Sequence, residues 1–512
     1  MAAALLFWQS PWEGCLHKNI GFNSLSTDAL QRENRLLQQP SCSFDGPRKK
    51  HLTNLGNIGI DDKRIKIFFF GACMGRIAIP PLNDATNGWS RILPTREPHP
   101  PLQQDIQVDW VVVGAGQAGL AAARRLAENR PGDSIALIEA GESGEGAQGR
   151  NAGFIIDTPH NIGSSLEELS SARSYISLAR VAIQSLEEQV RKYDIRCDWD
   201  ASGKLHAAVT PKGISQILEP TRKVLESLNE PYTWFEGRSL HERIGFKHFT
   251  AGIYTPGSIL VNPAALSRGL ADNMPANVTL YEHTPVTFAE FSPEIRLKTP
   301  QGTIRAGKAI LAVSVFAEQF GLLRNRLIPI SACGSLSRQL TEDEQGRLEG
   351  LPSWGLTPAN AFVGVTVRRT RDQRILIRQD MRYQPELRRS SSSYGTVRAH
   401  HQDLLERWFP ALKDLAIEHT WSGFICVSRN GGSGFGKVAP NVYSAVCDNG
   451  LGWTKGTISG LLIADKATGI DNPLIETYEA LGHAAKLPPR PFLDIGIRAR
   501  FAFELWRNRH EA

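Results

Sequence analysis

The chain has 512 residues, of which 41% are hydrophobic and 21% charged, so it has room for two or three units that each bury a core. Its formal net charge of +6 is small and is not concentrated in a long basic tract, which argues against a nucleic-acid partner. Seven cysteines, an odd number without a C-x-x-C pair, argue against a disulfide framework or a metal site and are compatible with a reducing cytoplasm.

Residues 1–73 show no sustained hydrophobic period and lack the basic start, apolar core and cleavage site of a secretory signal. Their longest apolar run, Ile65–Cys73, is far shorter than the ~18 residues that a membrane span needs. Three interpretations fit residues 1–73: a disordered leader, a targeting segment, or an upstream extension of a reading frame whose natural start is Met74. We favour the extension, followed by a proline-rich extended arm over residues 74–107.

The first motif begins with a short apolar run. Trp110–Val113 is rich in β-branched residues, which favours a buried parallel strand. Gly114, Gly116 and Gly119 follow in the pattern G-x-G-x-x-G. The first glycine permits a tight turn, the second lets the backbone approach a pyrophosphate, and the third lets the next helix lie close to the sheet.

A helix over Leu120–Asn129 and a strand over Ser134–Glu139 complete the pattern of a βαβ unit. The N-terminal N–H groups and the positive dipole end of that helix face the glycine turn, where a diphosphate binds. Glu139 ends the second strand twenty positions beyond Gly119, where it is placed to hydrogen-bond a ribose hydroxyl. The alternative is that these are ordinary turn glycines, but the order of strand, glycines, helix, strand and terminal acid predicts an adenine dinucleotide site.

The segment Gly146–Gly153 distinguishes a flavin-binding site from a nicotinamide-binding site. A nicotinamide dehydrogenase would normally continue into another crossover helix, whereas a loop of small residues with Arg150 and Asn151 can wrap the pyrophosphate and reach the flavin ring. This G-x-x-G-R-N-x-G arrangement resembles the D-amino-acid oxidase superfamily of flavoproteins, and within it the γ-glutamylputrescine oxidase-like amine oxidoreductases. The resemblance implies FAD as cofactor, with Arg150 and Asn151 among its contacts.

The middle of the chain predicts a mixed second domain. A long packing helix from Leu166 to about Tyr193 and a stretch with many aromatic residues, Pro231–Leu260, precede a helix that Asn262 caps before Pro263. The resemblance implies that the backbone at Val286 lies against the adenine. Arg382–Arg398 is polar and serine-rich, which indicates an exposed loop.

The expected fold class is therefore α/β with an α+β second domain: a Rossmann-like FAD-binding domain and a discontinuous mixed-sheet substrate domain. The expected boundaries are 108–195, 258–320 and 420–470 for the FAD-binding domain, 196–257 and 321–419 for the substrate domain, and 471–512 for a C-terminal tail.

A second glycine motif lies about 300 residues after the first. A strand over Val442–Val446 leads to a turn and then to a helix over Thr457–Ala467. The turn presents free backbone N–H groups that suit a flavin ring carbonyl or the ribityl chain. It is similar to the closing motif of the superfamily, in which the matching positions here are Gly450, Gly452, Gly456 and Gly460.

One departure from the superfamily bears on the substrate. In its amino-acid and glycine oxidases a W-x-G-like strand continues into Arg-Pro, and that arginine clamps the substrate carboxylate; here Trp421–Phe424 continues into Ile425–Cys426. Bidentate recognition of an α-carboxylate is weakened, which favours an amine, a polyamine or an N-substituted amine. Arg429, Arg378 and Arg368 are alternative sources of a carboxylate contact, although a structural or solvated role is the default for each.

Four further side chains are candidates near the flavin ring. Trp453 and Trp421 are placed to wall the substrate pocket from two sides. Lys455 and Lys437 are candidates for the cation that assists oxygen reduction in sarcosine-oxidase-like relatives, although lysines near glycine turns are mostly exposed.

The sequence thus predicts a cytoplasmic FAD-dependent oxidoreductase that oxidises a C–N bond of an amine or N-substituted amine by hydride transfer to flavin N5. Its expected partners are a small amine substrate and either oxygen or an electron carrier, with no metal, nucleic acid or membrane span. The alternatives are an amino-acid or opine dehydrogenase that passes electrons to a carrier, and a flavin-binding subunit without turnover of its own.

Overall fold

The computed structural model describes residues 73–77, 84, 86–159, 166–388, 393–412 and 414–511. The expected leader therefore lies outside the described residues except for Cys73, which opens the first strand, β1. Within the described ranges, no helix is long and apolar enough to cross a membrane.

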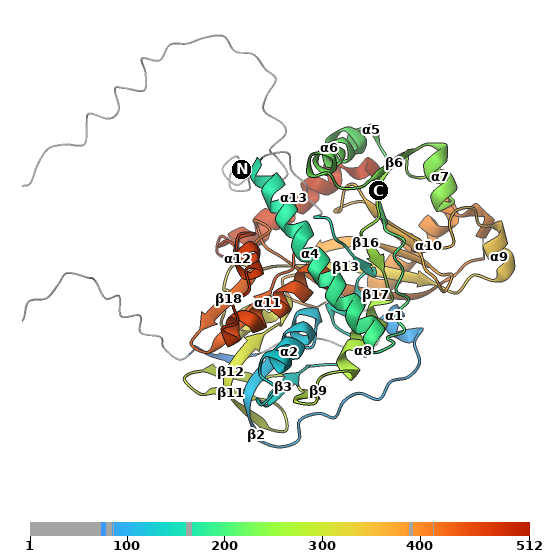
Figure 1. Ribbon diagram of the computed structural model, residues 1–512. Helices are drawn as coiled ribbons and strands as arrows, with labels where there is room; N and C mark the ends of the chain where they lie inside the picture. Colours follow the sequence, from blue (N-terminus) through green and yellow to red (C-terminus); the bar gives the residue numbers. More distant parts are fainter. Residues whose placement is uncertain are drawn as a thin grey trace, which may run out of the picture. The chain divides into compact units, whose positions relative to one another are not determined.

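Among the described residues, the first sheet has nine strands around a parallel core, which Figure 1 shows in the lower part of the molecule. The core order is β19-β12-β2-β3-β9, and every neighbouring pair in it runs parallel. Antiparallel strands extend it on the side of β12 and β19. Its strands are β1 (Cys73–Arg76), β2 (Ile106–Val113), β3 (Ile135–Ile138), β9 (Val278–Tyr281), β10 (Phe288–Phe291), β11 (Ile295–Lys298), β12 (Thr303–Leu311), β18 (Gly434–Ala439) and β19 (Val442–Val446). The Rossmann-like prediction is confirmed.

The second half of the central strand β2, Trp110–Val113, is buried on both faces, which explains its unbroken apolar run. Trp110 and Val112 enter one core cluster, together with side chains of the covering helices. Val111 and Val113 point the other way, into a cluster that contains residues of β10 and β11. Because successive strand residues face opposite sides, a strand buried on both sides needs apolar residues at every position.

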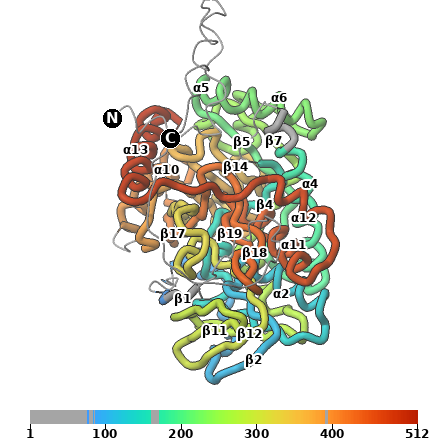
Figure 2. The backbone as a smooth tube through the Cα atoms, turned by 90° about the vertical axis from the view of Figure 1, so that its left-hand side faces the viewer, coloured from blue at the N-terminus to red at the C-terminus, as the bar shows by residue number. Residues whose placement is uncertain are grey.

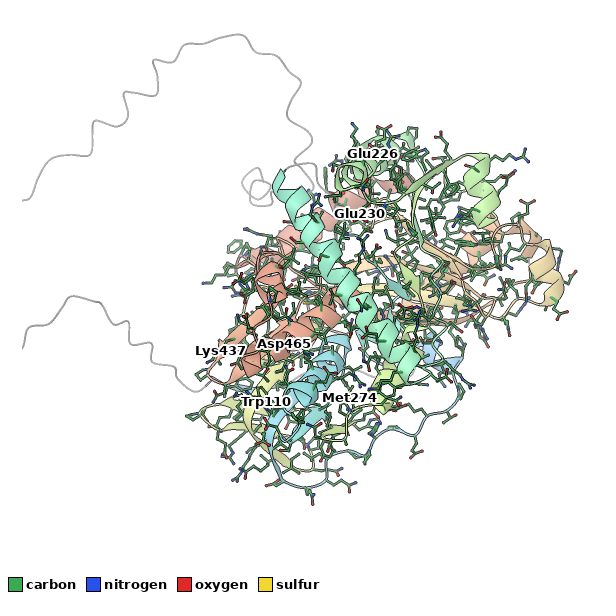
Figure 3. The ribbon with its side chains drawn as sticks, viewed as in Figure 1. Trp110, Glu226, Glu230, Met274, Lys437 and Asp465 are labelled. Carbon is green, nitrogen blue, oxygen red and sulfur yellow. The ribbon has the colours of Figure 1, made fainter. Side chains whose placement is uncertain are left out.

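Helices cover one face of this sheet, and α2 (Gln117–Asn129), α4 (Leu166–Lys192) and α11 (Thr457–Thr468) lie together there (Figure 1). Asp465 of α11, labelled in Figure 3, accepts hydrogen bonds from Arg125 at 2.7 Å and from Asn129 at 2.8 Å. Burial alone would raise the pKa of Asp465, but these hydrogen bonds outweigh it and lower that pKa. The pairing ties α11 to α2, which lies more than 300 residues earlier in the chain.

The second sheet, as far as the structure describes it, has eight strands of mixed direction in the order β17-β13-β16-β15-β14-β5-β7-β6. Figure 2 shows β5, β7 and β14 at the top of the view and β2, β11 and β12 of the first sheet at the bottom. The strands of the second sheet are β5 (Lys204–Ala208), β6 (Thr233–Glu236), β7 (Ala251–Thr255), β13 (Ile328–Ser337), β14 (Trp354–Pro358), β15 (Thr366–Arg369), β16 (Ile375–Tyr383) and β17 (Ile417–Val427). A short two-stranded sheet pairs β4 (Phe154–Ile155) with β8 (Ile259–Leu260).

The remaining helices are short or lie at the edges of the two sheets. They are α1 (Gly88–Arg91), α3 (Ala147–Arg150), α5 (Pro211–Gly213), α6 (Glu219–Leu228), α7 (Arg238–Ile244), α8 (Pro263–Asp272), α9 (Glu342–Arg347), α10 (Ser393–Trp408), α12 (Leu474–Glu479) and α13 (Phe492–Arg507). The expected cap on α8 is confirmed, because the Asn262 side chain accepts from the backbone N–H groups of Ala264 and Ala265.

Three segments differ from expectation. Helix α10 begins at Ser393, inside the expected loop, because Tyr394 and Val397 pack on Cys333 of β13. Strand β17 pairs with β13 in the second sheet, although the expected boundary places residues 420–427 in the FAD-binding domain. The expected C-terminal tail contains α12 and α13, which pack on β18 and β16 through Tyr478 and Leu493.

We expect the contact between α2 and α11 to tolerate no larger side chain at Gly460. A Cβ at this position would lie 2.2 Å from the carbonyl oxygen of Ala118 and 2.9 Å from the Cβ of Ala121. Gly460→Ala should therefore lower the free energy of unfolding by about 1–3 kcal/mol, as overpacked cores do, measured by thermal or denaturant unfolding. Gly346→Ala in α9, where a Cβ meets nothing within 4 Å, is the matched control and should be neutral or stabilising.

Candidate functional site

A cavity of about 1710 Å³, including its open mouth, lies at the carboxyl ends of β2, β3 and β12 and continues to β17. The carboxyl edge of a parallel sheet is where such folds bind nucleotides. Its lining includes Gly114, Gly116, Glu139, Arg150, Val286 and Gly456 from the predicted site.

The glycine turn at one end of the cavity depends on close backbone approach. Gly114 has φ +96°, and a Cβ there would lie 2.7 Å from the carbonyl oxygen of Ala312. A Cβ at Gly119 would lie 1.8 Å from the carbonyl oxygen of Gly114, so only glycine allows α2 to start this close to β2. Gly116 is the N-cap of α2, and the first N–H groups of the helix are therefore available at the cavity wall.

Glu139 follows β3 and lines the same end of the cavity. Its Oε2 accepts from the backbone N–H of Ala115 at 2.9 Å, and its Oε1 accepts from that of Gly141 at 3.0 Å. Burial raises the pKa of Glu139, although these two hydrogen bonds act to lower it. Since a carboxylate has about four acceptor positions, Glu139 keeps capacity for the hydroxyls of a ligand. Val286, at the same end, is buried and lines the cavity.

Arg150 joins three separate segments at the middle of the cavity. Its guanidinium donates to Asp84 Oδ1 at 2.7 Å, to the backbone oxygen of Ser422 at 3.1 Å and to that of Glu145 at 2.8 Å. The arginine thus fixes the flavin loop between the arm before β2 and strand β17. Asn151 is structural in the same loop: its side chain donates to Gln148 O at 2.6 Å and accepts from Gly153 N at 2.8 Å.

Sequence reasoning missed an acidic and hydroxylic cluster in the cavity wall. Tyr394 OH donates to Asp84 Oδ2 at 2.9 Å and lies 2.8 Å from Ser422 Oγ. Burial alone would raise the pKa of Asp84, but the charge of Arg150 and the hydrogen bonds lower it. Asp84, Tyr394 and Ser422 come from the arm, a serine-rich stretch and a strand, and carry no local motif. Only the tertiary fold brings them together.

The second glycine motif contributes to the wall of the same cavity. Asp448, Gly456 and Ser459 line the cavity, while Gly450, with φ +84°, and Gly452 are not among its lining residues. Instead of the expected turn alone, Gly452–Gly456 forms a π-helix that leads directly into α11. A Cβ at Gly452 or Gly456 would lie within 3 Å of the Gln117 side chain, so this turn packs directly on the start of α2. Burial raises the pKa of Asp448.

The two tryptophans are buried and do not line the cavity. Trp421 donates from its indole nitrogen to Arg150 O at 2.9 Å and lies edge-on to Trp89. Its place is therefore behind the flavin loop. Trp453 is 2% exposed and belongs to the core cluster of the first sheet, and its indole nitrogen has no hydrogen-bond partner in the part of the chain that the structure describes.

The two lysines differ in environment. Lys455 is buried beside the cavity, and its Nζ donates to Gly431 O at 2.9 Å. Burial lowers the pKa of Lys455, although Cys447 and Asp448, which both line the cavity, act in the opposite direction. Lys437 is exposed on β18 at the outer edge of the first sheet (Figure 3).

The arrangement fits FAD. It offers a glycine turn with a helix N-terminus for a pyrophosphate, an acid for a ribose, and a second glycine turn at the far end of one large cavity. Among the described residues, no group of three or more His, Cys, Asp or Glu side chains could hold a metal ion.

Comparisons with known proteins agree with this geometry. The chain is 25% identical over 405 residues to gamma-glutamylputrescine oxidoreductase of Escherichia coli, covering 77% of this chain and 90% of that protein. It is 24% identical over 395 residues to the probable oxidoreductase OrdL of Haemophilus influenzae, covering 75% and 88%. The fold is similar to that of glycine oxidase from Geobacillus kaustophilus, with a TM-score of 0.59, 21% identity and coverage of 72% and 96%.

Residues 109–466 match the family model described as FAD dependent oxidoreductase, a span that contains both glycine motifs and most of both sheets. The expected cofactor and the expected enzymatic class are confirmed. The chain belongs to the FAD dependent oxidoreductase family and is an FAD-dependent enzyme.

Proposed function

We propose that the enzyme oxidises a C–N bond of an amine or N-substituted amine. The observation that carries the proposal is one cavity that both glycine motifs line, through Gly116 and Gly456, and that β17 of the second sheet also lines, through Phe424. Similar proteins support this substrate class, since one is named gamma-glutamylputrescine oxidoreductase and others glycine oxidase and iminodiacetate oxidase.

In this proposal the chain holds the cofactor at five places. Glu139 accepts from a ribose hydroxyl, the N-terminus of α2 at Gly116 binds the pyrophosphate, and Val286 contacts the adenine. Arg150 fixes the loop beside the flavin, and the second glycine motif reaches the ring through its lining residue Gly456. Gly119, Asn151 and Gly452 act indirectly, by setting the backbone that makes these contacts.

Bound FAD supplies a two-electron acceptor at N5 for the hydride of the carbon next to nitrogen. The nitrogen lone pair forms the C=N bond as the hydride leaves, and water then hydrolyses the imine to a carbonyl compound and an amine or ammonia. The substrate must arrive with a neutral nitrogen. Apolar lining residues such as Val315, Phe316 and Phe424 favour that form, because desolvation penalises the ammonium ion.

Electrons then pass to oxygen or to a carrier. Lys455 supports oxygen as the acceptor, because a buried cation near Asp448 stabilises the negative charge that oxygen acquires on reduction. An amino-acid or opine dehydrogenase that uses a carrier, and a flavin subunit that only a partner reduces, remain the competing assignments. We place the enzyme in the cytoplasm, in keeping with the four free cysteines among the described residues.

The first test concerns the cofactor. Glu139→Ala should raise the Kd of FAD at least tenfold, because the ribose loses a charged acceptor, measured by fluorescence quenching on reconstitution of apoprotein. Glu128→Ala, on the exposed face of α2, is the control and should leave the Kd unchanged. Equal FAD affinity in both variants would remove Glu139 from the proposed site.

The second test concerns the acceptor. Lys455→Met should slow reoxidation of the reduced enzyme by air at least tenfold and leave anaerobic reduction by substrate nearly unchanged, as stopped-flow absorbance would show. Lys437→Met removes an exposed lysine from β18 and should alter neither step. If both variants reoxidise at the wild-type rate, Lys455 has no part in oxygen reduction.

The third test concerns the reaction itself. We expect anaerobic loss of the visible flavin band of the full chain with at least one class among polyamines, γ-glutamylated amines, N-methyl amino acids and D-amino acids. Return of the band on admission of air would show an oxidase, and return only with a quinone or dye would show a dehydrogenase. A holoenzyme that no amine or amino acid bleaches would refute the proposal.

A further inference from the structure

Helix α13 is apolar on two opposite sides. Its inner side packs on the second sheet, where Leu493 and Ile497 are buried in a cluster with Ile328 of β13. Its outer side is open to solvent and also carries large apolar side chains. Of the seven large hydrophobic side chains that are exposed among the described residues, five lie on α13: Phe492, Ile495, Phe503, Leu505 and Trp506. Such a contiguous group marks a surface where another body binds.

The exposed apolar residues form a stripe along the helix. This outer stripe consists of Phe492, Ile495, Ala499, Ala502, Phe503 and Trp506, all of them exposed. Apart from Phe503, they follow one another at alternating steps of three and four residues, which places them on one side of a helix. The rings of Phe503 and Trp506 lie with their centroids 6.1 Å apart. From Phe492 to Trp506 the stripe is about 21 Å long, at 1.5 Å per residue.

An arginine lies along each margin of the outer stripe. Arg498 follows Ile495 by three residues and precedes Ala502 by four, so it is their neighbour on the helix surface. Its side chain is 62% exposed and lies 3.8 Å from Glu386, an exposed pair that contributes little. On the other margin, the guanidinium of Arg507 lies 5.9 Å from the centre of the Phe503 ring. The stripe is therefore bordered by positive charge on both sides.

The acids of this segment are taken up by the protein itself. Residues 486–510 contain six lysines and arginines but only two acids, Asp494 and Glu504. Asp494 accepts from the hydroxyl of Tyr383 at 2.6 Å. Glu504 is buried and pairs with Arg500 at 2.6 Å. The solvent side of the segment thus carries a net positive charge.

An apolar stripe with aromatic residues and bordering arginines fits the surface of a membrane. The aromatic and aliphatic side chains can enter the boundary between lipid headgroups and acyl chains, while the arginines reach anionic headgroups through their apolar stems. A second copy of this chain fits less well. Contact between two outer stripes would bring their bordering arginines together, and like charges at such margins oppose pairing.

We propose that the outer stripe of α13 binds the surface of a membrane that contains anionic lipids, with the helix lying along that surface. The inference goes beyond the proposed reaction and does not depend on its substrate. Strand β17 connects this surface to the cavity: Val427 packs against the cluster on the inner side of α13, and Phe424 lines the cavity.

Sedimentation with lipid vesicles tests the surface on the full-length holoenzyme. The protein should bind vesicles of phosphatidylcholine that contain phosphatidylglycerol, and it should bind vesicles of pure phosphatidylcholine at least tenfold more weakly. Added salt should weaken binding to the anionic vesicles, because salt screens exposed charges. Absence of binding to the vesicles with phosphatidylglycerol would overturn the proposal.

Two pairs of variants separate the apolar from the electrostatic contribution. The double variant Phe492→Ser/Trp506→Ser should bind the anionic vesicles at least tenfold more weakly, because the stripe loses its two largest exposed side chains. Leu351→Ser, an exposed apolar position outside α13, is its control and should bind like the wild type. Arg498→Gln should weaken binding to anionic vesicles several-fold, whereas Arg238→Gln on α7, also an exposed arginine, should not. Wild-type binding by the double variant would refute the role of the stripe.

Stability and self-association provide the remaining checks. Since both serine substitutions replace mostly exposed side chains, the double variant should retain FAD and unfold at the wild-type temperature. If it unfolds earlier, Arg498→Gln decides the matter, because unchanged binding of that variant to anionic vesicles would overturn the proposal. Light scattering without lipid tests the second copy: a wild-type dimer that becomes a monomer in the double variant would assign the stripe to self-association instead.

Discussion

The structure depends on one backbone contact, the approach of α2 to the carbonyl oxygen of Gly114. A methyl group at Gly119 would lie 1.8 Å from that oxygen, so the absence of a side chain determines where the helix begins. From this contact follow the direction of the helix dipole, the position of the first free N–H groups and the packing of α11 against α2. The two ends of the cavity are joined through the same helix, since Gln117 packs on the second glycine turn.

Helix α1 and the second sheet are coupled to this nucleotide-binding core by hydrogen bonds to backbone oxygens of the flavin loop. Trp89 donates to Asn151 O, Trp421 to Arg150 O and Arg368 to Gly153 O. Each donor is a long or aromatic side chain from a segment distant in sequence, and each is almost fully buried. A loop of small residues has few side chains of its own to fix it, so its conformation is imposed by donors that reach its main chain. The side chains that hold the flavin loop are therefore different from those that line the cavity.

The sequence was sufficient wherever a function depends on local backbone geometry. The order of strand, glycines, helix and acid from Trp110 to Glu139, and the cap at Asn262, can be recognised because neighbours in sequence determine them. It was insufficient where the site depends on contacts between distant segments. Tyr394, for example, meets Asp84, which lies 310 residues earlier in the chain. The polar composition of Arg382–Arg398 predicts a loop, but a helix begins at Ser393 because the apolar side of α10 is buried against β13.

The chain order of the first sheet has a consequence for biosynthesis. Strand β12 pairs along one part of its edge with β11, which precedes it directly, and along the other with β19, more than 130 residues later. The end of the cavity at Gly114 needs Ala312, on which that glycine packs, whereas the second glycine motif is made only at Gly456. At 5–20 residues per second, a ribosome needs roughly 10–30 s to make the segment between them. During that interval the nascent chain has the first glycine motif but not the second, so the cavity that both motifs line can close only after Gly456 has left the ribosome.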